Sequence, residues 1–176
     1  MTFTPTDIDG AFLLQPERLS DERGFFARTF SSDEFCERGL DTQVVQRSVS
    51  WNRRRGTLRG MHFQAAPHEE TKLVSCIRGE IYDVIIDLRP GSPTHRRWIA
   101  ATLTAANGHS LYIPKGCAHG FITLTDDALV DYQISCAYHP ESAGGVRWND
   151  PAFGITWPLE YSVITDRDRG WPDYQR

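Results

Sequence analysis

Short runs of β-branched and aromatic residues, interrupted every few positions by Gly, Pro, Asn or Asp, constrain the fold of this chain more than any other feature. Such runs predict strands joined by tight turns. Many strands without helices between them predict an all-β sandwich, jelly roll or barrel. The predicted strands are Ala11–Gln15, Gly24–Phe30, Gln43–Val49, Thr57–Gln64, Thr71–Ile77, Glu80–Leu88, Arg97–Leu103, Ser110–Ile113, Gly120–Thr123 and Leu129–Ala137.

One helix is predicted at Ser32–Arg38, after the second of these strands. Ser31, with Glu34 three residues later, makes the pattern of a capping box, in which each side chain accepts a backbone N–H. Gly39 follows the last turn, where glycine commonly ends a helix because it adopts a positive φ without steric cost.

The length and net charge of the chain limit the number of domains and the classes of partner that it can have. A chain of 176 residues predicts one domain over residues 1–176, and a net charge of −4 argues against a dedicated nucleic-acid binder. No apolar run approaches the ~20 residues of a membrane span, and the first residues lack the basic and apolar regions of a signal peptide. We therefore expect a cytoplasmic protein whose partners are neither nucleic acid nor membrane.

Two predicted strands carry polar residues on apolar faces. Asp83 shares a face with Ile81 and Ile85 in a strand that is apolar on both sides, which implies burial. A buried aspartate needs a hydrogen-bonding or charged partner. Tyr132 also lies on an apolar face, and a buried tyrosine hydroxyl usually finds a partner. A strand-end contact for Asp83 and a plain core aromatic for Tyr132 are the simpler alternatives.

The segment Gly108–His119 carries a spaced motif. A glycine, five further residues and then Pro-x-Gly-x-x-His resemble the second signature of the cupin jelly roll. Pro114 and Gly116 suit a tight turn between strands. The strand after this turn then directs His119 into the barrel.

Metal-binding cupins pair that signature with a His-x-His motif and a glutamate, and this chain departs from the pattern. The corresponding segment, Arg59–Gln64, has one histidine, His62. His68, Glu69 and Glu70 follow in a segment predicted to be a loop. A catalytic transition metal needs three or four nitrogen or oxygen ligands close together, whereas His62 and His119 supply two. The four cysteines form no C-x-x-C pair. The sequence therefore predicts no metal site.

The predicted barrel interior holds groups suited to proton transfer, with a histidine base, a tyrosine acid and cations that hold an enolate. Alternation places Lys72 beside Val74 and puts Arg59 on the face opposite His62, unless the strand bends at Gly60. The interior candidates are His62, Lys72, His119 and Tyr132, with Asp83 and Arg59 nearby.

From about residue 10 to residue 170, the chain resembles the dTDP-4-dehydrorhamnose 3,5-epimerase family, with motifs in the same order and at similar spacing. The resemblance implies a cupin-like double-stranded β-helix (jelly roll) with a few short helices. The segments that carry it are Asp21–Phe26 (DERGFF), Gly56–Gln64 (GTLRGMHFQ), Lys72–Val74 (KLV), Tyr82–Arg89 (YDVIIDLR), Ser92–Thr94 (SPT), Ile113–Phe121 (IPKGCAHGF), Tyr132, Tyr138, Trp148–Pro151 (WNDP) and Trp157–Pro158.

The resemblance also implies an activity. Enzymes of this family invert C3 and C5 of a nucleotide-linked 4-keto-6-deoxy sugar, without a cofactor or metal. Carried over to this chain, His62 removes the proton next to the ketone, with Asp168 as its carboxylate partner. Lys72 stabilises the enolate oxygen, and Tyr132 returns a proton from the opposite face. A histidine, with an ordinary pKa of ~6.5, is a usable base at neutral pH, and a tyrosine, with one of ~10, is a weak acid.

The substrate-binding residues are carried over in the same way. Family members are homodimers in which an N-terminal strand of one subunit completes the site of the other, so Arg23 and Phe26 would act across the interface. The remaining binding residues implied by the resemblance are Gln46, Ser48, Arg59, His119, Tyr138 and Arg167.

Three departures from the family pattern fall at positions that line the nucleotide end of its pocket. The family commonly has an acidic residue where this chain has Arg28, Gln-Asp-Asn where it has Gln-Arg47-Ser48, and a glutamate where it has Ala143. The positions assigned to the chemistry are intact. We therefore expect the same reaction with altered recognition of the nucleotide or sugar, and neutral drift is the alternative.

Two other classes of function remain open from the sequence. The first is a metal-dependent cupin enzyme, such as a dioxygenase or isomerase, and metal analysis would separate it from an epimerase. The second is a non-catalytic cupin that binds a sugar or nucleotide, in which loss of His62 would leave the biological role intact.

Overall fold

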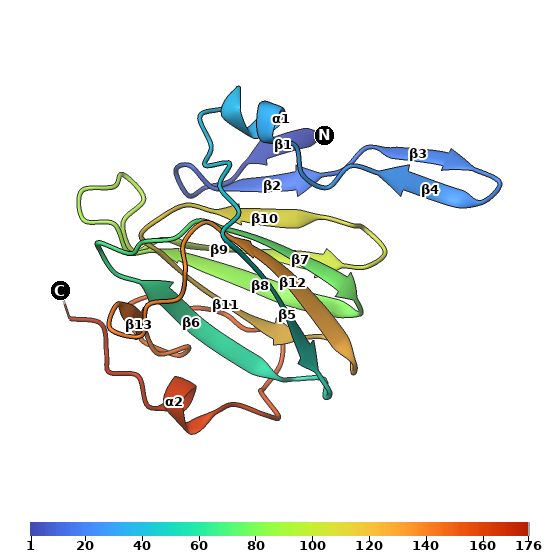
Figure 1. Ribbon diagram of the computed structural model, residues 1–176. Coiled ribbons are helices and arrows are strands. Elements are labelled where there is room, and N and C mark those ends of the chain that lie inside the picture. The colour runs from blue at the N-terminus through green and yellow to red at the C-terminus, as the bar shows by residue number, and fades with distance from the viewer. Residues whose placement is uncertain (176) are drawn as a thin grey trace.

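The computed structural model describes residues 1–175, and its elements are antiparallel strands with two short helices, α1 (Ser32–Cys36) and α2 (Asp166–Arg169) (Figure 1). Neither helix has the length and apolar character needed to cross a lipid bilayer. The strands are β1 (Thr2–Pro5), β2 (Phe12–Gln15), β3 (Arg18–Asp21), β4 (Gly24–Ala27), β5 (Gln46–Asn52), β6 (Leu58–Gln64), β7 (Lys72–Arg78), β8 (Glu80–Asp87), β9 (Trp98–Thr104), β10 (Ser110–Ile113), β11 (Cys117–Thr123), β12 (Ala128–Ile134) and β13 (Ala143–Gly145).

The strands form two facing sheets and a separate hairpin. One sheet has the order β1-β2-β10-β7-β12-β5, the other has the order β13-β6-β11-β8-β9, and β3 pairs with β4 alone. From β5 to β8, and again from β10 to β12, successive strands alternate between the two sheets. This alternation is the predicted double-stranded β-helix, or jelly roll. Apolar side chains from both sheets, among them Val74, Ile85, Leu111, Phe121 and Val130, fill the space between them.

Several predicted strand boundaries were wrong. β11 begins at Cys117, three residues before the predicted start, because Cys117 and Ala118 already pair with Asp87 and Ile86 of β8. β4 ends at Ala27 instead of Phe30, where the chain leaves its hairpin with β3. The short strands β1, β3 and β13 were not predicted at all.

The helix α1 begins at the predicted residue, but the predicted capping box was wrong. The Ser31 side chain makes no capping hydrogen bond, and Glu34 instead forms an ion pair with the N-terminal ammonium of Met1 at 3.2 Å. The helix also ends at Cys36, before the predicted Arg38. Gly39 has a φ of +67° and donates its N–H to the Cys36 carbonyl, which agrees with the predicted glycine stop.

A bulge in β6 bends the strand at the position where the sequence analysis required a bend. His119 of β11 pairs with His62, but Phe121 pairs with Arg59, so β6 uses one residue more than its partner. Gly60 has a φ of +140°, and a Cβ there would lie 2.6 Å from the Cα of Gly120. The close approach of these two glycines therefore brings the side chains on both sides of the bulge to one face.

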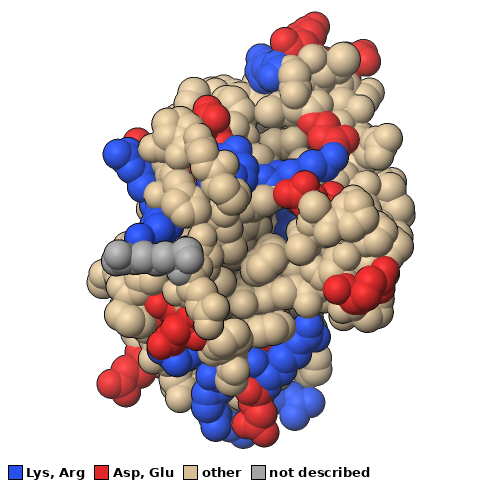
Figure 2. Space-filling model, turned by 90° about the vertical axis from the view of Figure 1, so that its left-hand side faces the viewer, with Lys and Arg blue, Asp and Glu red and all other residues tan. Residues whose placement is uncertain are grey.

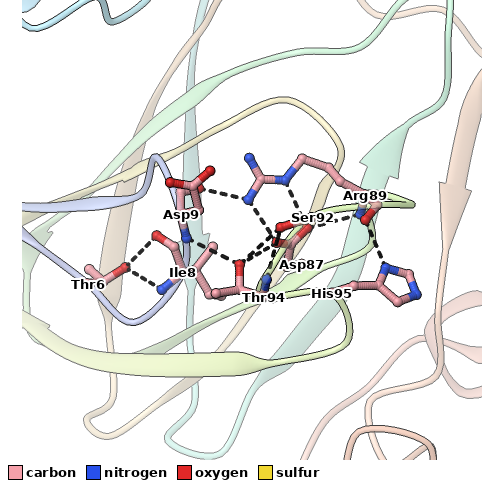
Figure 3. A network of polar contacts seen from close by, with 8 residues as sticks. All are labelled: Thr6, Ile8, Asp9, Asp87, Arg89, Ser92, Thr94 and His95. Carbon is pink, nitrogen blue, oxygen red and sulfur yellow. Dashed lines mark hydrogen bonds and ion pairs between the residues drawn. The ribbon is translucent and has the colours of Figure 1, made fainter.

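A polar network closes the end of β8 (Figure 3). The buried carboxylate of Asp87 accepts two hydrogen bonds of 2.8 Å from Arg89 and one from each hydroxyl of Ser92 and Thr94, at 2.5 and 2.6 Å. Arg89 also donates to the carbonyl of Asp9, 2.7 Å away, so the network ties the N-terminal segment to the barrel. Burial by itself would raise the pKa of Asp87, but these hydrogen bonds outweigh it and lower the pKa.

We expect Asp87→Asn to lower the free energy of unfolding by about 2 kcal/mol, because hydrogen bonds to a buried charge are lost or weakened. Because the pKa is lower in the folded state, the carboxylate stabilises the fold fully above its unfolded pKa of ~3.9, and this contribution is lost as the pH falls below that value. Urea unfolding between pH 3 and pH 7 tests this prediction. Asp7→Asn, at an exposed position, should change little, and an equal loss in both variants would contradict the assignment.

Candidate active site

Two adjoining cavities lie at one end of the barrel. The first, of about 270 Å³, lies between the two sheets, and the second, of about 330 Å³, adjoins it. Both are lined by Ser48, His62 and Ile134, so they share a wall. Figure 2 views the side of the molecule at the left of Figure 1, where the surface is hollowed near its centre and basic atoms are visible beside and within the hollow.

His62 forms a close pair with Asp168, a residue 106 positions later in the chain. β6 carries His62, and the short helix α2 brings the Asp168 carboxylate to 2.7 Å from Nε2 of the ring. The second carboxylate oxygen accepts the N–H of Gly60 at 3.3 Å. Burial alone would raise the pKa of Asp168, but the hydrogen bond and charge of His62 and the Gly60 N–H hold it below its usual value. An ionised carboxylate only accepts, so Nε2 carries the proton and Nδ1 is left as the basic nitrogen.

A second histidine–carboxylate pair lies deeper in the barrel. Nε2 of His119 is 2.7 Å from a carboxylate oxygen of Asp83, and both side chains are buried. Asp83 therefore has the partner that its buried position required. Burial raises the pKa of Asp83, and the charge and hydrogen bond of His119 offset only part of that rise. The other carboxylate oxygen of Asp83 has no hydrogen-bond partner among residues 1–175.

Tyr132 lines the same cavity from β12, in the opposite sheet from His62. Its ring meets that of His119 edge to face, with 6.2 Å between the centroids. Burial raises the pKa of Tyr132, although a hydrogen bond with Ser50 acts in the other direction. The phenol is therefore protonated at neutral pH and available as a proton donor.

Two basic side chains reach the first cavity, each with a polar partner. The ammonium of Lys72 lies 2.9 Å from the carboxylate of Glu70, and both side chains are buried to about nine-tenths. Arg59 donates from Nε to the side-chain oxygen of Asn52 at 2.7 Å. Arg59 lies on the same face as His62 because of the bulge at Gly60.

The structure brings together all but two of the predicted site residues. Arg23 and Phe26 lie on the hairpin of β3 and β4, where the Arg23 side chain is 85 % exposed and pairs with Asp21. The first cavity is lined by Ser48, Arg59, His62, Lys72, His119 and Tyr132, with Asp168 behind His62. The second cavity is lined by Gln46, Ser48, His62, Tyr138, Ala143 and Arg167.

Some lining residues were missed by the sequence analysis. Ser50 lies two residues beyond Ser48 in β5, and Gln64 lies two beyond His62 in β6, so alternation could have found both. Glu70 lies in a loop, where alternation gives no signal. Only its position two residues before Lys72 could have indicated that the two side chains form an ion pair.

One group of residues outside the barrel has the ligand types of a metal site, namely His68, His139 and Glu141. The two imidazole rings stack in parallel, with centroids 3.5 Å apart and planes inclined by 4°. A ring-nitrogen lone pair lies in the plane of its imidazole, so one ion cannot lie in the planes of two stacked rings and be coordinated well by both. Within the barrel, the Nε2 atoms of His62 and His119 each face a carboxylate.

The jelly roll and this cavity define a class of protein, the cupin-type enzymes, and the side chains that line the cavity are of the types used in acid–base catalysis. The base candidate, the acid candidate and an ammonium line one cavity, and each of the first two lies in a different sheet. A carbon next to a carbonyl could lose a proton to one side and regain it from the other.

Comparisons with known proteins agree with this class. The sequence model of the dTDP-4-dehydrorhamnose 3,5-epimerase family matches residues 5–176, and the chain belongs to this family. It is 44 % identical to the dTDP-4-dehydrorhamnose 3,5-epimerase of Methanothermobacter thermautotrophicus, over 96 % of this chain and 92 % of the relative. It is 35 % identical to a dTDP-4-dehydrorhamnose 3-epimerase of Streptomyces niveus, over 96 % of this chain and 82 % of the relative.

A solved structure is similar along the whole chain. The dTDP-6-deoxy-D-glucose-3,5-epimerase of Legionella pneumophila Philadelphia 1, in complex with dTDP-4-keto-L-rhamnose, matches with a TM-score of 0.90. The two chains are 35 % identical, and the match covers 99 % of each.

We expect Gly120→Ala to lower the free energy of unfolding by about 1–3 kcal/mol, the usual effect of overpacking. The added Cβ would lie 2.6 Å from Sδ of Met61 and 2.7 Å from the carbonyl oxygen of Arg59, so β11 and β6 must separate. Urea unfolding measures the loss. The control is Gly91→Ala, where φ is +83° but nothing lies within 4 Å, so only backbone strain of about 1 kcal/mol applies. A Gly120→Ala protein as stable as the wild type would contradict the close approach at the bulge.

Proposed function

We propose that the chain is an epimerase that inverts C3, C5 or both carbons of a nucleotide-linked 4-keto-6-deoxy sugar of the dTDP-4-dehydro-6-deoxyglucose type. The observation that carries the proposal is the placement of the His62–Asp168 pair and Tyr132 on opposite sheets around one cavity. Inversion at carbon requires removal of a proton from one face and return of a proton to the other. Membership of the family supplies the substrate class.

The proton-removal step uses the free Nδ1 of His62. The C–H bond next to the C4 ketone breaks, its proton moves to Nδ1, and its electron pair forms the enolate. The developing imidazolium is stabilised by the ionised Asp168, 2.7 Å from Nε2. The ammonium of Lys72 stabilises the negative charge that develops on the C4 oxygen.

The proton-return step uses Tyr132. Its phenol is held protonated by burial, so it donates to the enolate carbon from the face opposite His62 and thereby inverts the configuration. General acid and base groups typically contribute about 10²–10⁴-fold each. Charge stabilisation at the enolate oxygen must then supply a large part of the remaining rate enhancement.

The nucleotide and diphosphate are proposed to occupy the second cavity. Gln46, Ser48, Tyr138 and Arg167 line it and offer amide, hydroxyl, aromatic and guanidinium groups. Arg59 and His119, which line the first cavity, are proposed to bind the sugar or the diphosphate. Ser48 and Ala143, two of the departures from the family pattern, line this cavity. We infer that they alter recognition of the nucleotide or sugar and leave the reaction itself unchanged.

We also propose a homodimer in which an N-terminal element is exchanged. β1 pairs with β2 of the same chain, whereas the hairpin of β3 and β4 extends away from the barrel (Figure 1). Arg23 and Phe26 on this hairpin would complete the cavity of the partner. The large apolar side chains left exposed on the hairpin, β5 and β7 are Leu19, Phe25, Phe26, Val49, Trp51 and Ile77. Two of them, Phe25 and Ile77, line one pocket between the hairpin and β7, and an exposed apolar patch can mark an interaction site.

Solvent exchange tests the proposed reaction. In D₂O with dTDP-4-keto-6-deoxyglucose, we expect loss of the C3 proton signal, the C5 proton signal or both in the NMR spectrum. His62→Ala should abolish the exchange because it removes the base. Tyr132→Phe should slow inversion more than exchange, because it removes only the acid. Loss of both signals identifies a 3,5-epimerase, and loss of one identifies a mono-epimerase.

The same assay with CDP, GDP and UDP keto-sugars tests the altered recognition. Faster exchange with one of these than with the dTDP sugar supports the inference from Ser48 and Ala143, and a preference for dTDP contradicts it. No exchange with any of the four substrates would refute the proposed epimerase.

A charge on the exposed apolar face should separate the proposed dimer. Ile77 of β7 is 52 % exposed, so Ile77→Glu should leave the fold intact while placing two buried charges at the interface. Light scattering after size exclusion should give a dimer for the wild type and a monomer for this variant, with weaker substrate binding. Val163→Glu, at a 40 % exposed site in the C-terminal segment, is the control and should remain dimeric. A monomeric wild type would refute the proposal.

A further inference from the structure

Glu70 is a carboxylate beside the proposed reaction centre, and it takes no part in the two proposed proton transfers. It lies in the segment between β6 and β7, two residues before Lys72, and its side chain is only 11 % exposed. It lines the second cavity, next to the boundary with the first. A negative group is unexpected in a cavity that would take a nucleoside diphosphate, so its contacts need an explanation.

The contacts of Glu70 point to Lys72. One carboxylate oxygen lies 2.9 Å from the Lys72 ammonium, and the other accepts a hydrogen bond from the side-chain amide of Gln64 at 3.1 Å. The ammonium also donates to the backbone carbonyl of His62 at 3.4 Å, close to the limit for a hydrogen bond. A buried ammonium is costly unless it is paired, and Glu70 provides the short, charge-assisted contact.

Gln64 in turn is fixed by the two loops that border the second cavity. Its side-chain oxygen accepts the backbone N–H of His139 at 2.6 Å. Its amide nitrogen lies 3.0 Å from the carbonyl oxygen of His68 and 3.1 Å from that of Ala137, so its two N–H groups are shared among these carbonyls and Glu70. A carboxylate bound to such an anchored amide has little freedom to move. The position of the Lys72 ammonium is therefore set by a chain of contacts that begins in the loop after β12.

We propose that Glu70 is the positioning residue that holds the Lys72 ammonium toward the enolate oxygen, an inference that rests on the proposed epimerase. The ammonium donates one hydrogen bond to the Glu70 carboxylate and a second, longer one to the backbone carbonyl of His62. The remaining direction is open to the cavity that Lys72 lines. Lys72 therefore acts as a fixed hydrogen-bond donor at the reacting ketone. Because its charge is paired with Glu70, the diphosphate is bound by the arginines instead.

Kinetics of Glu70→Gln test this role, because glutamine keeps the shape of the side chain and removes its charge. A fixed donor matters more to the charged enolate than to the neutral ketone. We therefore expect kcat for exchange to fall about tenfold while KM changes less than about threefold. Glu70→Asp, which keeps the charge, should recover part of the loss. Glu69→Gln is the matched control at the neighbouring residue and should leave both constants unchanged.

A second measurement does not depend on catalysis. The chain contains two lysines, Lys72 and Lys115, so protein labelled with [¹⁵N]lysine gives at most two side-chain ammonium signals. The Lys72 signal should be visible, because the paired and buried ammonium exchanges slowly with water. It should broaden or disappear in Glu70→Gln, and it should persist in Glu69→Gln. Lys115, whose side chain is 53 % exposed, serves as the reference.

The two measurements separate the possible failures. An unchanged kcat together with an unchanged Lys72 signal in Glu70→Gln would overturn the positioning role. A lower melting temperature with unchanged kinetics would also overturn it, because the pair would then serve only stability. If the wild type exchanges no sugar proton, the proposed epimerase fails, and the ammonium signal still decides whether Glu70 holds Lys72.

Discussion

The cost of burying ionisable groups in an apolar barrel is the constraint on which the site depends. His62, His119 and Lys72 all lie inside or at the mouth of the barrel, and each has a carboxylate within 2.9 Å. An unpaired charge as deeply buried as the Lys72 ammonium would cost several kcal/mol. The partners come from three different parts of the chain, so the C-terminal segment and the loop before β7 must fold onto the barrel for these groups to be paired. Stability and the geometry of the site are therefore coupled.

The bulge in β6 decides which side chains this barrel can bring together. In a regular strand, residues three positions apart point to opposite faces, so Arg59 and His62 could not line the same cavity. The extra residue at the bulge removes this restriction, and it needs glycine on both strands, because a Cβ on Gly60 or Gly120 would meet the opposite backbone. The basic side chain and the proposed base are thus adjacent because of two residues that have no side chain.

The sequence predicted the parts of the fold that depend on regular patterns. Alternation placed Lys72 and Tyr132 in the interior, and the conflict at Arg59 correctly located the bend at Gly60. Contacts made by loops and chain ends could not be predicted from pattern, because they depend on tertiary folding. Glu34 pairs with the N-terminal ammonium instead of capping its helix. Glu70 was missed for the same reason, since its position is set by Gln64 and two loops.

Other parts of the site came from the family resemblance and not from the residues alone. Asp168 lies 106 residues from His62, and no periodicity links two positions at that distance. Arg23 and Phe26 were expected to bind substrate, yet in the chain alone they lie on an exposed hairpin. A single sequence gives no information about which surface a second copy covers. Their part in binding therefore depends on the proposed dimer.

In the proposed reaction, the charged groups around the two cavities divide into those that transfer protons and those that bind the substrate. The proposed base, its carboxylate, the proposed acid and the paired ammonium all belong to one chain, so the proposed proton transfers need no residue of a second protomer. The basic side chains that line the two cavities are Arg59, Lys72 and Arg167, and Lys72 is neutralised by Glu70. Arg59 and Arg167 would then face the diphosphate of the proposed substrate. A further guanidinium from the hairpin of a partner would strengthen binding of the nucleotide without contacting the reacting carbons, so dimerisation would act mainly on affinity.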